Sequence, residues 1–190
     1  VGKPRNFTRT ANRHDYAVKP PSDTALNALK NAGFDVISIG KINDIFVGEG
    51  ITKAYHSDSS VHGMEQTIDM LVEDFTGLCF TNLVDFDSLY GHRRNPIGYG
   101  KAIMDFDGRI PEIESKLGPK DIVILCADHG NDPTHSGFDH TREHIPFVAF
   151  GEPVKSANIG TRECFADIGA TICDYLGVDE PKIGESFLNE

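Results

Sequence analysis

The chain has 190 residues, of which 39% are hydrophobic and 25% charged, and its formal net charge at pH 7 is −11. The two percentages are typical of a globular domain with one ordinary core. The negative charge excludes nucleic acid and anionic membrane as binding surfaces, because both would repel the chain. No hydrophobic stretch approaches the roughly 20 residues of a membrane helix, and no signal peptide is visible.

The cysteines are scattered along the chain without any CxxC pair. Cys79 and Cys126 lie within apolar runs, so we expect buried, inert thiols rather than metal ligands. Unpaired thiols of this kind are typical of a reducing compartment, which predicts a cytoplasmic location.

The first segment, Val1 to Pro21, has neither a helical nor a strand period, and Lys3, Arg5, Arg9 and Arg13 make it locally basic. Two interpretations remain open. The commoner one for such a composition is a disordered arm or linker. The other is a surface for an anion such as phosphate, which arginine binds through paired N–H donors.

From Ser22 onward, segments with the helical period alternate with short apolar runs typical of buried strands. Ser22 is the predicted N-cap of the first helix, and Pro111 is expected to kink or break the third. This alternation predicts an α/β protein with a largely parallel sheet. The predicted helices span 23–33, 57–75, 98–117 and 162–176, and the predicted strands span 34–40, 77–84, 122–127 and 145–150.

Acidic and histidine side chains follow two of these predicted strands. Asp87 and His92 come after the strand at 77–84, while Asp128, His129 and later His140 come after the strand at 122–127. In α/β proteins, the loops at the carboxyl ends of strands are where ligands bind. Carboxylates and imidazoles packed this densely are costly to keep without a partner. The pattern therefore predicts a metal site, and its two converging sets predict a dinuclear one.

Carboxylate and imidazole ligands without cysteine suit Mn²⁺ or Zn²⁺, and the residue types do not choose between them. Two such ions about 3.5–4 Å apart can bind both the attacking and the leaving oxygen of a phosphoryl group in transfer. Lys41 follows the predicted strand at 34–40. Two interpretations of it remain: a solvated surface residue or a residue that binds a ligand. The other polar side chains near the predicted site are interpreted as loop, orienting or turn-capping groups: Asp85, Asp132, His135, Asp139 and His144.

Several separated motifs occur in order along the chain: NFTRTANRHDY (6–16), IGKINDIF (39–46), VDFDSLYGHRRN (84–95), ADHGNDPT (127–134) and DHTREHIP (139–146). Together they resemble the bacterial phosphopentomutases, which are members of the alkaline phosphatase superfamily. The resemblance extends over the whole chain. It implies a three-layer α/β/α fold with a largely parallel sheet, an alkaline phosphatase-like core that is incomplete here.

The same resemblance implies interconversion of ribose 1-phosphate and ribose 5-phosphate, and of the deoxyribose pair, by an isomerase that uses two Mn²⁺ ions. It assigns Asp87, His92 and His140 to one ion, and Asp128 and His129 to the other. Arg9 and Lys41 match residues that contact the substrate phosphate in the family. Zn²⁺ or another divalent ion stays possible.

The family's phosphorylated threonine and a further metal-binding aspartate match no residue of this chain, and both are expected upstream of Val1. Residues 1–17 are expected to end an inserted cap domain, and residues 18–190 to form the C-terminal part of the metal-binding core. We therefore expect no activity from this chain without the N-terminal portion. The alternatives are another phosphatase-superfamily enzyme, of the phosphoglycerate mutase or phosphodiesterase type, or a metal-stabilised domain that is not an enzyme.

Overall fold

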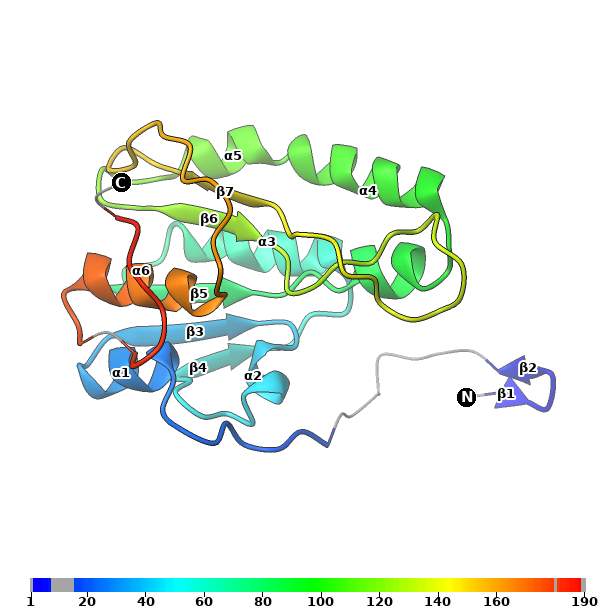
Figure 1. The fold of residues 1–190 in the computed structure, drawn as a ribbon, viewed down its shortest axis with the longest axis horizontal. Helices are drawn as coiled ribbons and strands as arrows, with labels where there is room; N and C mark the ends of the chain where they lie inside the picture. Colours follow the sequence, from blue (N-terminus) through cyan, green and yellow to red (C-terminus); the bar gives the residue numbers. More distant parts are fainter. Residues whose placement is uncertain (1, 8–15, 180, 189–190) are drawn as a thin grey trace.

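A computed structural model of the chain describes residues 2–7, 16–179 and 181–188, and Figure 1 shows the arrangement of its elements. The helices are α1 (Ala25–Asn31), α2 (Ile42–Ile45), α3 (Ser60–Met70), the π-helix η1 (Phe86–Gly91), α4 (Pro96–Asp107), α5 (Ile110–Glu114) and α6 (Ala166–Leu176). The strands are β1 (Gly2–Lys3), β2 (Asn6–Phe7), β3 (Asp35–Ile39), β4 (Lys53–Tyr55), β5 (Gly77–Thr81), β6 (Val123–Cys126) and β7 (Phe147–Phe150).

The described strands form three hydrogen-bonded groups. The central group is parallel, in the order β4-β3-β5, with Ile39 of β3 opposite Tyr55 and Thr81. β1 and β2 form a short antiparallel hairpin within the basic segment, where we predicted no strand. β6 and β7 are also antiparallel, with Cys126 opposite Phe147. β7 therefore departs from the predicted parallel arrangement, because the chain after β6 turns back and pairs with β6 itself.

Helices cover both faces of the parallel strands. Successive side chains of a strand point to opposite faces. Thr81 of β5 lies against α3, where its hydroxyl is 2.7 Å from that of Thr67. Leu78 and Phe80 pack on the other face, in the cluster that α1 and α6 share. The described elements thus form helix, sheet and helix layers, which confirms the predicted three-layer α/β/α fold (Figure 1).

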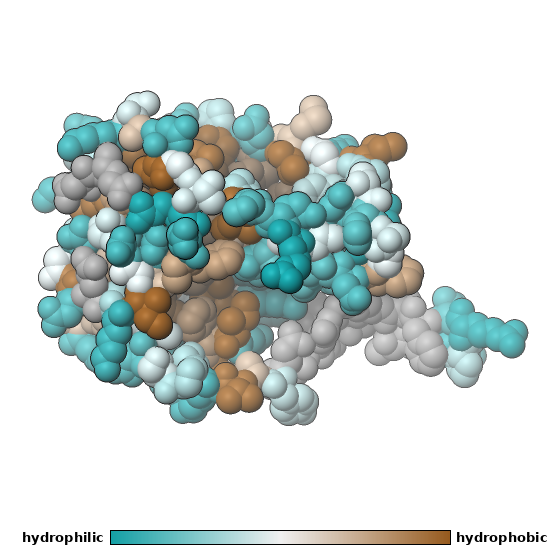
Figure 2. All heavy atoms as spheres, viewed as in Figure 1, coloured by the Kyte–Doolittle hydropathy of each residue, from teal (hydrophilic) through white to brown (hydrophobic). Residues whose placement is uncertain are grey.

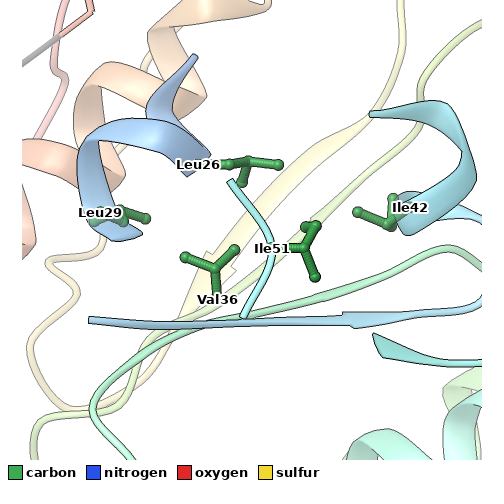
Figure 3. Packing of buried hydrophobic residues seen from close by; sticks show 5 residues of the cluster. All are labelled: Leu26, Leu29, Val36, Ile42 and Ile51. Atoms are coloured by element: carbon green, nitrogen blue, oxygen red, sulfur yellow. The ribbon is translucent and has the colours of Figure 1, made fainter. Parts of the chain in front are cut away.

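The main hydrophobic cluster lies between α1 and β3. Leu26 and Leu29 of α1 point toward Val36 of β3, while Ile51 and Ile42 close the cluster on the side of α2 (Figure 3). Leu29 and Val36 are fully buried. Burying side chains of this size stabilises a fold by about 1.5–3 kcal/mol each. This cluster holds β3 rigidly, and so fixes where its carboxyl end lies.

A second cluster joins α3 and α5 to the β6–β7 pair. Met64, Ile68 and Ile113 are buried in it, and Val123 and Phe150 pack against them. It carries β6, which precedes three of the five candidate metal ligands.

Several predicted boundaries differ from the observed ones. The first helix is capped by Thr24 rather than Ser22, and α3 begins after Ser59, whose hydroxyl accepts a hydrogen bond from the His62 backbone N–H. The predicted helix at 98–117 is two helices, because the chain breaks at Gly108 and Pro111 lies in the first turn of α5.

Some apolar side chains that we predicted to be buried are exposed. Val61 and Val72, assigned to the inner face of the helix around α3, point to solvent, and so does Phe165 before α6. Cys126 is exposed as well, because it is the last residue of β6. Figure 2 shows hydrophobic side chains among hydrophilic ones on the visible face of the molecule. No helix within the described ranges combines the length and apolarity that crossing a bilayer requires.

Ser38 of β3 provides a test of the core. Its hydroxyl is fully buried and has no hydrogen-bond partner within the described part of the chain. We expect Ser38→Ala to stabilise the fold by about 1 kcal/mol. The substitution removes a buried hydroxyl that gives up its hydrogen bonds to water on folding and gains none in the protein. Thr171→Val is the matched comparison, because the buried Thr171 hydroxyl bonds to Asp167 O and to the Phe187 N–H. Urea denaturation should show the opposite sign for Thr171→Val, and destabilisation by Ser38→Ala would contradict the assignment.

The carboxyl-terminal segment is held by the buried Asp167 of α6. The Asp167 carboxylate accepts hydrogen bonds from the Glu185 backbone N–H at 3.0 Å and from Arg162 Nε at 2.9 Å. The hydrogen bond from Glu185 lowers the pKa of the Asp167 carboxyl, Arg162 adds to this effect, and burial opposes it.

A lowered folded-state pKa means that Asp167 stabilises the protein above the unfolded pKa of about 4, and that this contribution is lost as the pH falls through the folded value. We therefore expect Asp167→Asn to destabilise the protein at pH 7 and to differ less from the wild type at lower pH. Thermal melts at several pH values measure this difference. A difference that stays constant down to pH 3 would contradict it.

Candidate metal centre

The predicted ligands gather at one end of the strands. Figure 1 shows the arrowheads of β3, β5 and β6 at the same end, so the loops that follow these strands leave the fold side by side. The loop after β5 leads into η1, which carries Asp87. The loop after β6 carries Asp128, His129 and His140. The strand ends thus bring together residues that are far apart in sequence.

The π-helical turn of η1 places Asp87 and His92 on one side. The His92 backbone N–H donates to the Asp87 carbonyl at 2.9 Å, an i→i+5 bond that closes one wide turn. In an α-helix, two residues five apart would diverge by about 140° around the axis. Here, His92 Nε2 lies 3.3 Å from Asp87 Oδ2. π-Turns are often found at functional sites, and this one makes the contact possible.

Two residues of the long loop between β6 and β7 pair with each other and thereby align two further histidines. Gly130 and Thr141 form an isolated antiparallel bridge, in which the Thr141 N–H donates to Gly130 O at 3.1 Å. His129 and His140 each precede one residue of this bridge. Their rings stack with centroids 3.7 Å apart and planes inclined by 19°. The bridge therefore holds the two imidazoles face to face.

The nitrogen and oxygen atoms that can bind metal point toward one another. His140 Nε2 lies 3.3 Å from Asp87 Oδ1 and 3.2 Å from His92 Nε2. Asp87, His129 and His140 each offer one ligand atom within 4.8 Å of the other two. Asp87 and His140 therefore lie close to His92, with which we predicted them to share a metal ion, and also close to His129.

The orientation of the imidazoles fits a divalent cation. His92 Nδ1 lies 2.6 Å from Phe138 O, and His129 Nδ1 lies 3.1 Å from Gly130 O. A carbonyl oxygen only accepts, so Nδ1 of each ring is the donor, which leaves Nε2 as the atom available to a metal ion. Metal-binding histidines are commonly oriented in this way. A cation lying among these nitrogen lone pairs and the Asp87 carboxylate would stabilise all of them.

Asp128 lies at the open side of the group. Its Oδ1 is 3.6 Å from His129 Nε2, and its side chain is 68% exposed, whereas that of His129 is 31% exposed. Burial raises the pKa of Tyr99 in α4, and the charges of Asp87 and Asp128 raise it further. All five predicted metal ligands therefore lie in one neighbourhood, at an accessible edge of the fold.

Of the two predicted phosphate-binding residues, the structure describes Lys41 but not Arg9. Lys41 follows Gly40 at the carboxyl end of β3, and Gly40 approaches Asn82 after β5 so closely that a side chain there would strike the Asn82 carbonyl. Lys41 therefore lies at the same edge of the sheet as the metal ligands. Arg9 lies outside the described residues.

Of the remaining polar residues near the site, Asp85 and Asp132 bind backbone N–H groups in a helix cap and a turn. The Asp85 carboxylate accepts from the Ser60 N–H at 2.7 Å, while Ser60 Oγ accepts from the Asp85 N–H, which ties α3 to the loop before η1. Asp132 Oδ1 accepts from the backbone N–H and the hydroxyl of Thr134. His135 and His144 are exposed on the loop.

Two residues of the site were not identified from the sequence. Asn131 is buried and donates from Nδ2 to Asp87 Oδ1 at 2.6 Å. Arg94 donates to several oxygens of the 131–139 loop. Their only sequence signal is their position inside the HRRN and HGND stretches, next to predicted ligands.

Comparisons with known proteins identify the family of the chain. Residues 4–180 match the metalloenzyme superfamily. A curated phosphopentomutase from Agathobacter rectalis is 60% identical to the chain, over all of the chain and 49% of that protein. The chain thus spans about half the length of this curated relative.

A solved structure of phosphoglycerate mutase from Leishmania mexicana, determined at low cobalt concentration, has a similar fold with a TM-score of 0.66. The alignment covers 86% of the chain and 38% of that protein at 16% identity, so it bears on the fold alone. The superfamily match covers nearly the whole chain and agrees with the predicted fold class. The chain belongs to the metalloenzyme superfamily.

Proposed function

We propose that this chain is the C-terminal part of a phosphopentomutase, which interconverts the 1-phosphates and 5-phosphates of ribose and deoxyribose. The observation that carries the proposal is the 60% identity to a phosphopentomutase along the entire chain. The converging Asp87, His92, His129 and His140 side chains support a metal-dependent phosphoryl transfer. Since the chain spans about half of that relative, the activity is proposed for a longer protein.

The proposed cofactors are two Mn²⁺ ions, with Zn²⁺ as the alternative. Asp87, His92 and His140 are proposed to hold one ion, and Asp128 and His129 the other. When bound, the ions supply positive charge that neutralises the oxygens of the phosphoryl group in transfer. The Nδ1–H bonds of His92 and His129 to backbone carbonyls keep Nε2 of each ring directed at the site.

The proposed phosphoryl donor is a phosphorylated threonine, which we place in the N-terminal portion of the longer protein. Its Oγ–P bond breaks as the 1-hydroxyl oxygen of ribose 5-phosphate bonds to phosphorus, and the hydroxyl proton passes to the threonine Oγ, which gives ribose 1,5-bisphosphate. The threonine Oγ then bonds to the phosphorus of the 5-phosphate, the bond from that phosphorus to the sugar oxygen breaks, and the threonine proton passes to this oxygen, which leaves ribose 1-phosphate. Arg9 and Lys41 are proposed to hold the distal phosphate of the sugar through charge-assisted hydrogen bonds.

The proposed domain organisation rests on the resemblance of the sequence motifs to the phosphopentomutases. Residues 1–17 are proposed to end a cap domain and residues 18–190 to belong to the metal-binding core. The proposed location is the cytoplasm, in keeping with the free thiols of Cys79, Cys126, Cys164 and Cys173.

An assay of the full-length protein tests the proposed function. With Mn²⁺ present, ribose 5-phosphate should be converted to ribose 1-phosphate, and phosphoglycerate should not react. Chelation should abolish the activity and added Mn²⁺ should restore it. Turnover of phosphoglycerate alone would favour the phosphoglycerate mutase alternative. The purified 190-residue chain should be inactive, because it lacks the proposed nucleophile.

A further inference from the structure

Arg94 has an unusual backbone conformation and lies two residues after His92. Its φ is 52°, in the left-handed region that non-glycine residues rarely adopt. A residue keeps such a conformation only where its surroundings hold it there. The contacts of the Arg94 side chain supply that restraint.

The guanidinium group of Arg94 binds both ends of the 131–139 loop. Nη1 donates to Asp132 O at 2.7 Å and to Asn131 Oδ1 at 2.8 Å. Nε donates to Gly137 O at 2.6 Å, and Nη2 donates to Asp139 O at 2.7 Å. A further bond from Nη1 to Gly91 O, at 3.3 Å, returns to the end of η1. A single side chain thus joins η1 to two separate stretches of the loop.

These contacts bear on three of the proposed metal ligands. Because Asn131 Oδ1 accepts from Arg94, the Asn131 amide must turn its Nδ2 donor toward Asp87, which it meets at 2.6 Å. Phe138 O, which accepts from His92 Nδ1, lies between the two carbonyls bound by Nε and Nη2. The Asp139 carbonyl directly precedes His140.

The packing around Asn131 leaves it little freedom to turn. Asn131 is only 8% exposed, and a side chain added at Gly91 would collide with its amide. The amide orientation that Arg94 selects is therefore fixed by shape as well as by hydrogen bonding.

We propose that Arg94 is a positioning residue for the metal centre: its guanidinium fixes the 131–139 loop, and through that loop it orients Asp87, His92 and His140. This inference rests on the proposed metal-dependent function. Arg94 acts through other residues, since its donors are occupied by carbonyl and amide oxygens of the chain.

The direction of the change in metal affinity on replacing Arg94 distinguishes a positioning role from a simple effect of its charge. Removing a positive charge beside a cation site raises metal affinity by reducing repulsion. Loss of a positioning residue lowers metal affinity, by about 10- to 100-fold for residues that support ligands. We therefore expect Arg94→Ala to weaken Mn²⁺ binding in this range. Arg94→Lys keeps the charge but loses the planar fork of donors, so it should weaken binding as well.

The test measures Mn²⁺ dissociation constants of the full-length protein by calorimetry, with Arg93→Ala as the matched control. Arg93 is an exposed neighbour of the same charge, so its removal should leave the affinity unchanged or slightly higher. Equal affinities in the wild type and Arg94→Ala would overturn the positioning role while leaving the proposed function intact. A wild type without any Mn²⁺ binding would overturn the proposed function instead.

A second measurement does not depend on metal. In the metal-free protein, the proton on His92 Nδ1 is bound to the Phe138 carbonyl and should give a protected imidazole N–H signal in NMR. Arg94→Ala should lose that signal and Arg93→Ala should keep it, with both variants folded by circular dichroism. Retention of the signal in Arg94→Ala would overturn the inference whatever the metal binding shows.

Discussion

Replacing Asp87 by Asn is expected to lower divalent-metal affinity by more than about 100-fold, which is the upper limit for residues that only support a ligand. Asp87 lies within 3.3 Å of both His92 Nε2 and His140 Nε2. The substitution keeps the size of the side chain but removes the negative charge that the cation needs. The proposed mutase activity of the full-length protein should fall with it, and calorimetry together with a coupled assay measures both effects.

Asp105→Asn is the control for this prediction. Asp105 is an exposed acid of α4 that pairs with Lys101 at 3.0 Å on the helix surface, so its loss should change neither affinity nor activity. The metal-free Asp87→Asn variant should be at least as stable as the wild type, because a carboxylate with no cation beside it is removed. Unchanged Mn²⁺ affinity in Asp87→Asn would show that the metal lies elsewhere.

Leu29→Ala is expected to cause the largest loss of stability, about 2–5 kcal/mol, through lost burial and the cavity that remains. Leu29 is fully buried between α1 and β3, in the cluster that α6 also joins. Because β3 leads to Lys41 at the carboxyl end of the sheet, a loosened α1–β3 contact also moves that edge. Urea denaturation followed by circular dichroism measures the loss.

Met104→Ala is the matched control, since it removes a side chain of similar size from α4 at a position that is 73% exposed. It should change stability by no more than about 0.5 kcal/mol. Equal losses for the two variants would mean that the α1–β3 cluster is not the main core of the protein.

The apolar runs of the sequence were sufficient to predict the main strands and the position of the candidate site. β3, β5, β6 and β7 all lie within their predicted ranges, because buried strands are composed of short β-branched and aromatic runs. The position of Asp128 and His129 after β6 follows from that periodicity alone. The direction of β7 could not be predicted in this way, since periodicity does not say which neighbour a strand pairs with.

The supporting residues of the site could not be predicted from the sequence for a different reason. Arg94 and Asn131 are 37 positions apart, and their contact exists only in the folded loop. The π-helical turn that aligns Asp87 with His92 likewise has no simple periodic signature. Exposed positions such as Val61 were predicted wrongly because the helical period identifies an apolar stripe but not its width.

Equilibrium dialysis of the full-length protein against Mn²⁺ tests most directly the central claim that these side chains form a dinuclear metal centre. The bound metal is counted for the wild type and for His140→Ala, which removes the ring lying between His92 and His129. We expect two ions per chain in the wild type and fewer than two in the folded variant at the same Mn²⁺ concentration. Two ions retained by His140→Ala, or none bound by the wild type, would contradict the claim.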